Sequence, residues 1–352
     1  MITVGFNDRV YPAGALATIV QVLAREGIAE SRALEGVHLN PRALRSYKTR
    51  VSVNQTLQVV RNAAKLSHDP HFAYHAGQRF HVSTFGMYGF AILSSTSFRQ
   101  GIDFATRYKQ LVLPLVDISF REEHGRGIWS FLPIAHPSID PELSRFLIEH
   151  YMSIAISLHR DGMGSSFTPL EVHLQFSRPP DAVVYDHMFG CPVLFDQKEN
   201  QLVFDASWLD REATLGNEIA HSETVKLCDE LLEQLQLGAG VAGRVRELLL
   251  TNALAPISCA AVATKLHMTE RTLRRKLHEE RTSFRRLLHE LRMRMAVKYL
   301  RDTDLAIHEV AASLGFSEDA SFRRAFRRWT KTPPQQYRTR QARAIRRQLR
   351  AA

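Results

Sequence analysis

Residues 307–329 read Ile307-His-Glu-Val-Ala-Ala-Ser-Leu-Gly-Phe-Ser-Glu-Asp-Ala-Ser-Phe-Arg-Arg-Ala-Phe-Arg-Arg-Trp329. The pattern predicts two short helices joined at Leu314-Gly-Phe316, which is the arrangement of a helix-turn-helix. One face of the second helix is apolar and is expected to be buried; it consists of Phe322, Ala325, Phe326 and Trp329. The other face consists of Ala320, Arg323, Arg324 and Arg327, with Asp319 near the helix start. A helix with such an outward face can enter the major groove of DNA.

A second unit of the same kind precedes this one. We expect a first short helix over residues 244–252 that ends near Pro256, a second from an N-cap at Ser258 to Leu266, and a third from an N-cap at Thr269 to about Glu280. In the third helix Leu273 and Leu277 are expected to be buried. Its opposite face consists of Arg271, Arg274, Arg275 and His278. Guanidinium groups can bind guanine edges or phosphates with two hydrogen bonds. The alternative for each arginine is that it only belongs to a solvated helix face and has no partner.

A long amphipathic helix is predicted between the two units. Its apolar residues are Phe284, Leu287, Leu288, Leu291, Met295 and Tyr299. At 1.5 Å per residue this helix spans roughly 27 Å. Together with the helices at its ends, it can hold two recognition helices about 34 Å apart, which is one turn of B-DNA. One chain could then read two successive major grooves.

The charge distribution divides the chain into two parts. Of the 46 Lys and Arg residues 25 follow Gly240, with 10 of the 36 Asp and Glu, so this part has a net charge of +15. Residues 1–240 carry −5, and the whole chain carries +10. A basic segment attached to a mildly acidic body is typical of a polyanion-binding module carried by a different domain.

The segment from about Val241 to Arg338 resembles the DNA-binding domain of AraC/XylS transcription regulators. The matching residues are Glu309-Val-Ala, Leu314-Gly-Phe, Ser321-Phe, Ala325-Phe, Trp329, and Pro334 through Tyr337-Arg338. The resemblance implies base contacts from Arg271, Arg274 and Arg275 in the first unit, and from Asp319, Ala320, Arg323 and Arg324 in the second. The chain departs from the family at His267, Arg281 and Lys331, where glycine is common. Left-handed backbone at such residues costs on the order of 1 kcal/mol each.

The first 240 residues predict a different kind of domain. Helices are expected over residues 16–23 (ending at Gly27), 57–64, 85–93, 98–108 and 141–160. A β-hairpin is expected from residues 116–120 and 128–132, with further strands at 172–176 and 202–204. A long helix over 221–237 precedes Gly238-Ala-Gly240, a predicted hinge. The expected fold is an α+β N-terminal domain, with helices and a small antiparallel sheet, followed by an all-α domain with two helix-turn-helix motifs joined by a long helix.

This first half resembles the arabinose-binding-type N-terminal domain of a branch of AraC-like regulators that includes regulators of ornithine use. The match covers roughly Leu16 to Arg211 and lies in Arg107-Tyr108, His173-Leu-Gln-Phe-Ser177, Phe189-Gly-Cys-Pro-Val-Leu-Phe195 and Asn200-Gln-Leu-Val-Phe204. The helical start does not suit the cupin barrel of the sugar-responsive regulators. The resemblance implies effector sensing and dimerisation, but it transfers no ligand and no binding residue.

These observations predict four segments. Residues 1–237 form an effector-binding and dimerisation domain, 238–243 a linker, 244–340 the double helix-turn-helix domain, and 341–352 a basic tail. A candidate effector site combines aromatic side chains with an arginine that can pair with a carboxylate; its residues are Arg79, Phe85, Tyr88, Phe90, Arg107 and Tyr108. The expected effector is an amino acid or an amphipathic carboxylate such as a fatty acid. The alternative is that these aromatic residues belong to the core.

Catalytic and metal-binding patterns are weak in this chain. His71 and His75 lie four residues apart with His81 nearby, but without a neighbouring Cys or carboxylate ligand they are expected to be ordinary polar or capping residues. Gly162-Met-Gly-Ser-Ser166 lacks the lysine of a phosphate-binding loop. The three cysteines, Cys191, Cys228 and Cys259, form no CxxC pair and are expected to be reduced. We therefore predict neither a metal nor a cofactor, and the start of the chain suggests no export signal or membrane span.

The sequence thus predicts a cytoplasmic transcription regulator. It would bind double-stranded promoter DNA, respond to a small-molecule effector, form a homodimer and contact RNA polymerase. Two alternatives stay open. One is a ligand-independent architectural DNA-binding protein, which would not need a domain of 240 residues. The other is an enzyme fused to a DNA-targeting module, for example an alkyl transferase with a nucleophilic cysteine, although no cysteine here has a basic neighbour.

Overall fold

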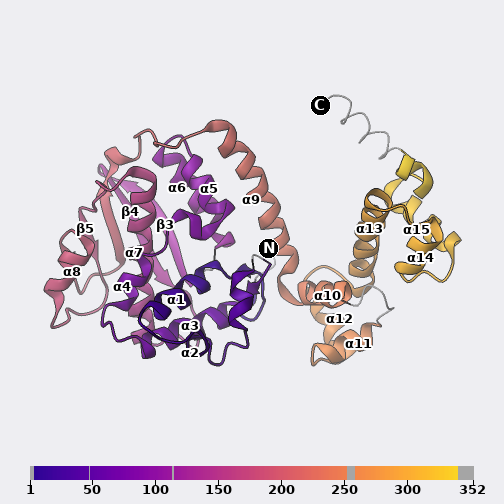
Figure 1. The fold of residues 1–352 in the computed structure, drawn as a ribbon, viewed down its shortest axis with the longest axis horizontal. Coiled ribbons are helices and arrows are strands. Elements are labelled where there is room, and N and C mark those ends of the chain that lie inside the picture. Colours follow the sequence, from indigo (N-terminus) through magenta and orange to yellow (C-terminus); the bar gives the residue numbers. More distant parts are fainter. Residues whose placement is uncertain (1–3, 47, 113–114, 252–257, 340–352) are drawn as a thin grey trace. The chain divides into compact units, whose positions relative to one another are not determined.

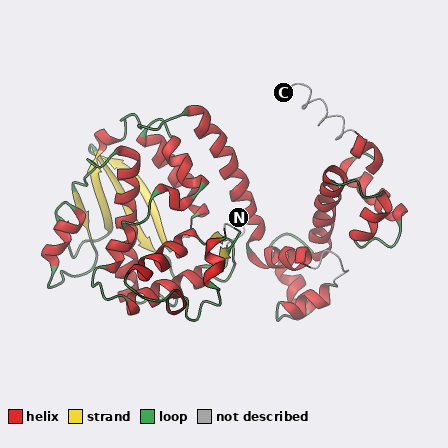
Figure 2. Ribbon diagram, in the orientation of Figure 1, coloured by secondary structure: helices red, strands yellow, loops and turns green. Residues whose placement is uncertain are grey.

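The computed structural model describes residues 4–46, 48–112, 115–251 and 258–339. The chain divides between Leu235 and Gln236 into two compact units, the N-terminal and C-terminal units (Figure 1). The predicted basic tail and the region around Pro256 lie outside the described residues. Strands occur in the N-terminal unit, whereas the described elements of the C-terminal unit are helices (Figure 2). This arrangement confirms the predicted fold class.

The N-terminal unit is mainly helical. Its helices are α1 (Gly14–Arg25), α2 (Glu30–Ala33), α3 (Val53–Leu66), α4 (Phe72–Gly77), α5 (Met87–Ser94), α6 (Phe98–Tyr108), α7 (Pro141–Met163), α8 (Ala182–Phe189) and most of α9 (Glu218–Gly238). Short 3-10 helices occur at η1 (Pro41–Arg45), η2 (Val82–Phe85), η3 (Lys109–Leu111) and η4 (Ala206–Trp208). Helix α7 packs against α4 on one side and against the sheet on the other. Leu147, Ile148 and Met152 of α7 are completely or almost completely buried, so this helix forms the centre of the unit.

A five-stranded sheet has the order β3-β4-β7-β5-β6. Its strands are β3 (Val116–Glu123), β4 (Arg126–Pro133), β5 (Glu171–His173), β6 (Val193–Leu194) and β7 (Asn200–Asp205). The pairs are antiparallel except β5 with β6, which is parallel. A separate antiparallel pair joins β1 (Tyr11–Pro12) to β2 (Arg50–Val51). The predicted hairpin is therefore confirmed, and the short strands β1, β2 and β6 were not predicted.

Two predictions for the N-terminal unit need correction. The helix expected over residues 85–93 starts only at Met87, because Gly86 has φ 55° and separates η2 from α5. The strand expected over 172–176 is three residues long and ends at His173. By contrast, α1 ends as expected just before Gly27, which has φ 81° and leaves the helical region.

The C-terminal unit contains α10 (Gly240–Thr251), α11 (Cys259–Lys265), α12 (Glu270–Glu279), α13 (Phe284–Asp302), α14 (Ile307–Ser313) and α15 (Asp319–Thr330). It has two hydrophobic cores. The first includes Leu273, Leu277 and Leu287, and the second includes Leu300, Phe322 and Phe326. Helix α13 contributes to both cores, so it has the connecting role that the apolar spacing predicts.

Three residues stand where the family commonly has glycine, and all three have the left-handed backbone that the resemblance implies. His267 has φ 54°, Arg281 has φ 55° and Lys331 has φ 58°. Each follows the end of a helix by one or two residues, where a left-handed residue ends the helix. The turns therefore have the expected conformation, and each non-glycine side chain adds a cost on the order of 1 kcal/mol.

Residues 238–243, predicted as a linker, are mostly helical. Helix α9 continues to Gly238 and α10 begins at Gly240, so only Ala239 lies between them. Ala239 and Ala242 are completely buried, and Val241 is nearly so. The glycines around Ala239 suggested flexibility, but here they permit a tight helix-to-helix bend: Gly240 has φ 72°, and a Cβ on Gly243 would lie 1.9 Å from the Gly238 carbonyl oxygen.

Helix α4 approaches α7 closely at Gly77. A Cβ on Gly77 would lie 2.6 Å from the His150 carbonyl oxygen and 2.7 Å from Ser153 Cβ. Gly77→Ala is therefore expected to destabilise the N-terminal unit by about 1–3 kcal/mol, measured by chemical denaturation. Gly162→Ala in α7 is the control, because nothing lies within 4 Å of its Cβ position and alanine favours the helix. Equal stabilities of the two variants would contradict this packing.

Candidate DNA interface and ligand cavities

The first candidate recognition helix, α12, is set by its caps and its buried face. Ser258 Oγ accepts a hydrogen bond from Ala261 N (3.1 Å) at the start of α11, and Thr269 Oγ1 accepts one from Thr272 N (3.2 Å) at the start of α12. Leu273 and Leu277 are completely buried. Because these leucines fix the rotation of α12, its opposite face is exposed, and that face carries Arg271, Arg274, Arg275 and His278.

Two of these arginines already have carboxylate partners on the same helix. Arg274 pairs with Glu270 and Arg275 pairs with Glu279, each at a spacing of four residues. All four side chains are well exposed, and such pairs contribute little in water. The glutamates orient the guanidinium groups along the helix, and a phosphate or a guanine edge can replace them as the acceptor.

The second candidate recognition helix, α15, repeats this arrangement. Phe322 and Phe326 are completely buried, Ala325 is buried, and Trp329 packs partly buried against the same core. On the outward face Arg323 and Arg327 are exposed and have no ion pair among the described residues. Arg324 Nη2 donates to Ser321 Oγ (3.2 Å), Ala320 is exposed, and Asp319 is half-buried. The structure thus places both predicted sets of residues on exposed helix faces, and their contacts with DNA stay predictions.

Glu280, at the end of the first recognition helix, was not identified from the sequence. Its carboxylate accepts hydrogen bonds from Val241 N and Ala242 N, both at 2.8 Å. These are the first backbone donors of α10, where the helix dipole also favours a negative charge. Gly240 permits the approach, because a Cβ there would lie 2.7 Å from Glu280 Oε1. We call this contact the Glu280 clamp.

Arg246 strengthens the same junction from α10. Its Nη1 donates to the Leu237 carbonyl oxygen (2.6 Å) near the end of α9, and its Nη2 lies 3.9 Å from Glu290 of α13. Burial lowers the pKa of Arg246, although its guanidinium is still cationic at neutral pH. Ionic hydrogen bonds therefore join the start of α10 to α12 and to the end of α9, an ion pair joins α10 to α13, and the first core adds apolar contacts.

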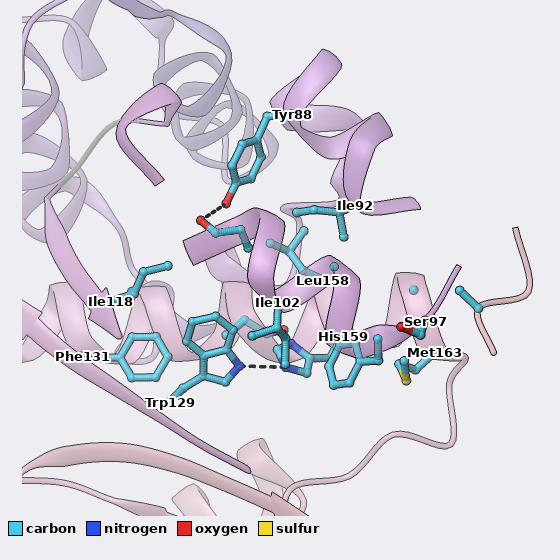
Figure 3. Close-up of a pocket in the computed structure, with 16 residues that line it drawn as sticks. Tyr88, Ile92, Ser97, Ile102, Ile118, Trp129, Phe131, Leu158, His159 and Met163 are labelled. Atoms are coloured by element: carbon cyan, nitrogen blue, oxygen red, sulfur yellow. Dashed lines mark hydrogen bonds between the residues drawn. The ribbon is translucent and has the colours of Figure 1, made fainter. Parts of the chain in front are cut away.

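A first cavity in the N-terminal unit has a volume of about 100 Å³ and lies between α5, α6, α7 and the β3–β4 hairpin (Figure 3). It is lined by Tyr88, Ile92, Ser97, Phe98, Gly101, Ile102, Ala105, Ile118, Trp129, Phe131, Ala155, Leu158, His159, Gly162, Met163 and Ala213. Trp129 Nε1 donates to His159 Nε2 (3.1 Å), and the Tyr88 hydroxyl donates to the Ala105 carbonyl oxygen (3.3 Å). The cavity is therefore apolar, and its polar groups already bond to one another or to the backbone.

A second cavity of about 110 Å³ adjoins the first. Helices α1, α3, α5 and α7 and the hairpin line it, with Phe80, Phe85, Thr56, His150 and Tyr151 among its residues. The two cavities share Tyr88, Ile118, Phe131, Ala155 and Leu158, which form a common wall. Both are apolar and bordered by few polar groups, as is usual for small-molecule sites.

Two histidines of α7 border these cavities and are neutral at physiological pH. Burial lowers the pKa of His150 and of His159 to about 4. Their Nδ1 atoms face the carbonyl oxygens of Ala73 (2.9 Å) and Ala155 (2.6 Å), so the proton of each neutral ring lies on Nδ1. His159 Nε2 then accepts from Trp129, whereas His150 Nε2 keeps an acceptor lone pair.

The predicted effector residues are only partly brought together. Tyr88 lines both cavities and Phe85 lines the second. Arg79 and Arg107 line neither; Arg79 is exposed, and Arg107 lies 3.8 Å from Asp229. The Tyr108 hydroxyl donates to the same Asp229 (2.6 Å), and Phe90 is about half exposed. Within the described residues, neither cavity therefore has an arginine to pair with an effector carboxylate, and the predicted pairing with Arg79 or Arg107 stays a prediction.

The three histidines considered as metal ligands lie beside separate aspartates. His71 lies 3.5 Å from Asp181, His75 lies 2.6 Å from Asp69, and His81 lies 3.0 Å from Asp161. Within the described part of the chain, no group of three metal-ligating side chains occurs. In the same part, no helix has the length and apolar character that crossing a membrane requires.

Comparisons with known proteins agree with this architecture. Residues 27–213 match the model of the arabinose-binding domain of AraC transcription regulators, and residues 262–340 match a helix-turn-helix domain model. The ornithine utilization regulator of Pseudomonas aeruginosa is 28% identical over 336 residues, which cover 95% of this chain and 97% of that protein. The regulator VqsM of the same species is 25% identical over 260 residues, covering 72% and 79%. The crystal structure of its transcriptional regulator CdpR aligns with a TM-score of 0.48 at 24% identity, covering 93% and 98%.

The Glu280 clamp yields a prediction about the C-terminal unit. Glu280→Gln removes the charge from two hydrogen bonds at a helix start, so it is expected to lower the free energy of unfolding of this unit by about 1–2 kcal/mol. Glu279→Gln is the matched control, because its partner Arg275 is exposed, and it should change stability by less than about 0.5 kcal/mol. Denaturation followed by circular dichroism compares the two variants. An equally small loss of stability in both variants would show that the Glu280 clamp contributes no more than an exposed ion pair.

The neutral histidines yield a prediction about pH. Their folded-state pKa of about 4 lies below the ordinary value of 6.5, so between these values the unfolded chain binds more protons. The contribution of these neutral histidines to the free energy of unfolding is therefore fully present above pH 6.5 and is lost as the pH falls toward 4. From pH 7 to pH 5 the free energy of unfolding of the N-terminal unit should fall by about 2 kcal/mol for each histidine. His150→Gln should make the decrease smaller; an unchanged pH dependence would contradict the account.

Proposed function

The chain belongs to the AraC-type transcription regulators with an arabinose-binding-type N-terminal domain, and we propose that it reads promoter DNA with both α12 and α15. The observation that carries this proposal is the rotation of the two helices, since each buries one face in its own core and exposes an arginine-bearing face. On α12 the reading residues are Arg271, Arg274 and Arg275. On α15 they are Asp319, Ala320, Arg323, Arg324 and Arg327.

The N-terminal unit is proposed to bind the small-molecule effector in the two adjoining cavities. Binding would favour one arrangement of the unit and shift the population toward it. Helix α6, which lines the first cavity, carries Tyr108, and the Tyr108 hydroxyl binds Asp229 of α9. Helix α9 in turn ends at Leu237 and Gly238, where Arg246 of α10 holds it. This chain of contacts is the proposed route from effector to DNA reading.

Three further features belong to the same proposal. As a regulator of this family, the protein is proposed to act in the cytoplasm, to contact RNA polymerase and to work as a homodimer. Light scattering of the purified chain tests the dimer. We assign no enzymatic activity. Burial raises the pKa of the Cys191 thiol to about 12 and that of Cys228 to about 11, so neither is a ready nucleophile at neutral pH.

The proposal predicts the effect of removing one arginine from each recognition helix. Genomic sites are first located by chromatin immunoprecipitation, and affinities for the recovered operator are then measured at fixed salt. Arg274→Ala and Arg324→Ala are each expected to lower operator affinity by about 10- to 100-fold and to relax base preference. Arg301→Ala is the control, because Arg301 is an exposed α13 arginine bonded to Asp302.

Two outcomes would contradict the proposal. If both variants bound the operator as tightly as the original chain, α12 and α15 would not read DNA. If the original chain bound random duplexes as tightly as the operator, the architectural alternative would be correct and no effector would be needed.

A further inference from the structure

The described linings of the two cavities lack the charged side chains that a site for an amino acid or a fatty acid requires. Among the described residues, neither cavity is lined by an arginine, lysine, aspartate or glutamate. The titratable groups that line them are tyrosines with raised pKa values and the two histidines, all uncharged at neutral pH. A carboxylate inside these cavities would find no cation to compensate its lost hydration.

The polar groups of the first cavity are already used within the protein. Trp129 donates to His159, and His159 faces the Ala155 carbonyl oxygen through Nδ1. Tyr88 donates to Ala105, and Ser97 Oγ accepts from Gln100 N (3.2 Å) as the cap of α6. A ligand in this cavity therefore meets mainly hydrocarbon and the faces of aromatic rings, as the close-up shows (Figure 3).

The second cavity offers an acceptor on His150. Thr56 donates to the Ser52 carbonyl oxygen (3.2 Å), and the proton of the neutral His150 ring is directed to Ala73. His150 Nε2 therefore has a lone pair to which a ligand hydroxyl can donate. A carboxylate is an acceptor only and cannot use this nitrogen.

The two cavities, of about 100 and 110 Å³, together have room for a ligand that occupies both. An apolar cavity of about 150 Å³ holds a benzene molecule. Each cavity here is smaller than that, but Tyr88, Ala155 and Leu158 stand in their common wall. Ala155 presents only a methyl group there, so a slender chain can pass from one cavity to the other with a change of side-chain rotamers.

We propose that the effector is an uncharged, largely hydrocarbon molecule with a hydroxyl group, of the long-chain alcohol type. Its chain lies in the first cavity and crosses the wall at Ala155, and its hydroxyl donates to His150 Nε2 in the second. This inference rests on the proposed function, since it takes the cavities to be the effector site. It replaces the expected amino acid or amphipathic carboxylate.

The test compares a neutral ligand with its charged counterpart. The full-length chain is titrated by calorimetry with 1-decanol and with decanoate at pH 8, where the acid is ionised and both stay below aggregation. Decanol is expected to bind at least about 100-fold more tightly than decanoate, because the carboxylate loses its hydration without a partner. Across shorter 1-alkanols, affinity should fall about fourfold for each CH₂ removed.

Variants locate the binding. Ala155→Leu fills the common wall and should weaken decanol binding at least about tenfold. Ala24→Leu makes the same change at an exposed position of α1 outside both cavities and should leave binding unchanged. Gly162→Leu is a second filling variant of the first cavity, at a position where nothing lies within 4 Å of the added Cβ. Thermal unfolding followed by circular dichroism shows that the N-terminal unit of each variant is folded.

Different results would contradict the ligand class, the location of the site or effector sensing. Tighter binding of decanoate than of decanol would overturn the neutral ligand and leave the cavities as the effector site. Decanol binding that Ala155→Leu and Gly162→Leu do not weaken would overturn the assignment to these cavities. No binding of either probe by a chain that binds its operator would overturn both the ligand class and effector sensing here, but not DNA reading.

Discussion

Helix α13 belongs to both hydrophobic cores of the C-terminal unit, and this sharing determines how the two recognition helices are spaced. Leu287 near its start packs with Leu273 and Leu277 of α12, whereas Leu300 near its end packs with Phe322 and Phe326 of α15. A helix of 19 residues is a rod of about 28 Å. Because each recognition helix is anchored to this rod by its buried face, its rotation and its position follow from apolar packing. The arginines need only project from the opposite faces.

Ionic contacts hold the end of α9 and the start of α10 to the first core of the C-terminal unit. Glu280 holds the start of α10 to the end of α12, and Arg246 holds the end of α9. In the N-terminal unit α9 receives its own anchor at Asp229, from a tyrosine at the end of a helix that lines the first cavity. The proposed route from effector to DNA depends on these two sets of contacts.

Local patterns in the sequence were sufficient for much of this fold. The leucines of α12 and the phenylalanines of α15 predict which faces are buried, and His267, Arg281 and Lys331 take the backbone that the turns require. Long-range pairings were not predictable: Glu280 binds residues 38 and 39 positions away, and no local pattern marks it. The glycines around Ala239 predict a linker from composition alone, which cannot show that Gly243 also allows a close approach to the Gly238 carbonyl oxygen. The sequence also cannot show which side chains border a cavity, and Arg79 and Arg107 line neither of the two cavities.

The central claim is that one chain reads two successive major grooves through α12 and α15, and hydroxyl-radical and methylation-protection footprinting of the full-length chain on its operator tests it most directly. The account predicts, for each bound chain, two protected major-groove segments on the same side of the duplex, about one helical turn apart. Arg271→Ala should weaken protection of one segment and Arg323→Ala that of the other. A single protected segment for each chain, or the simultaneous loss of both segments from either variant, would contradict the account.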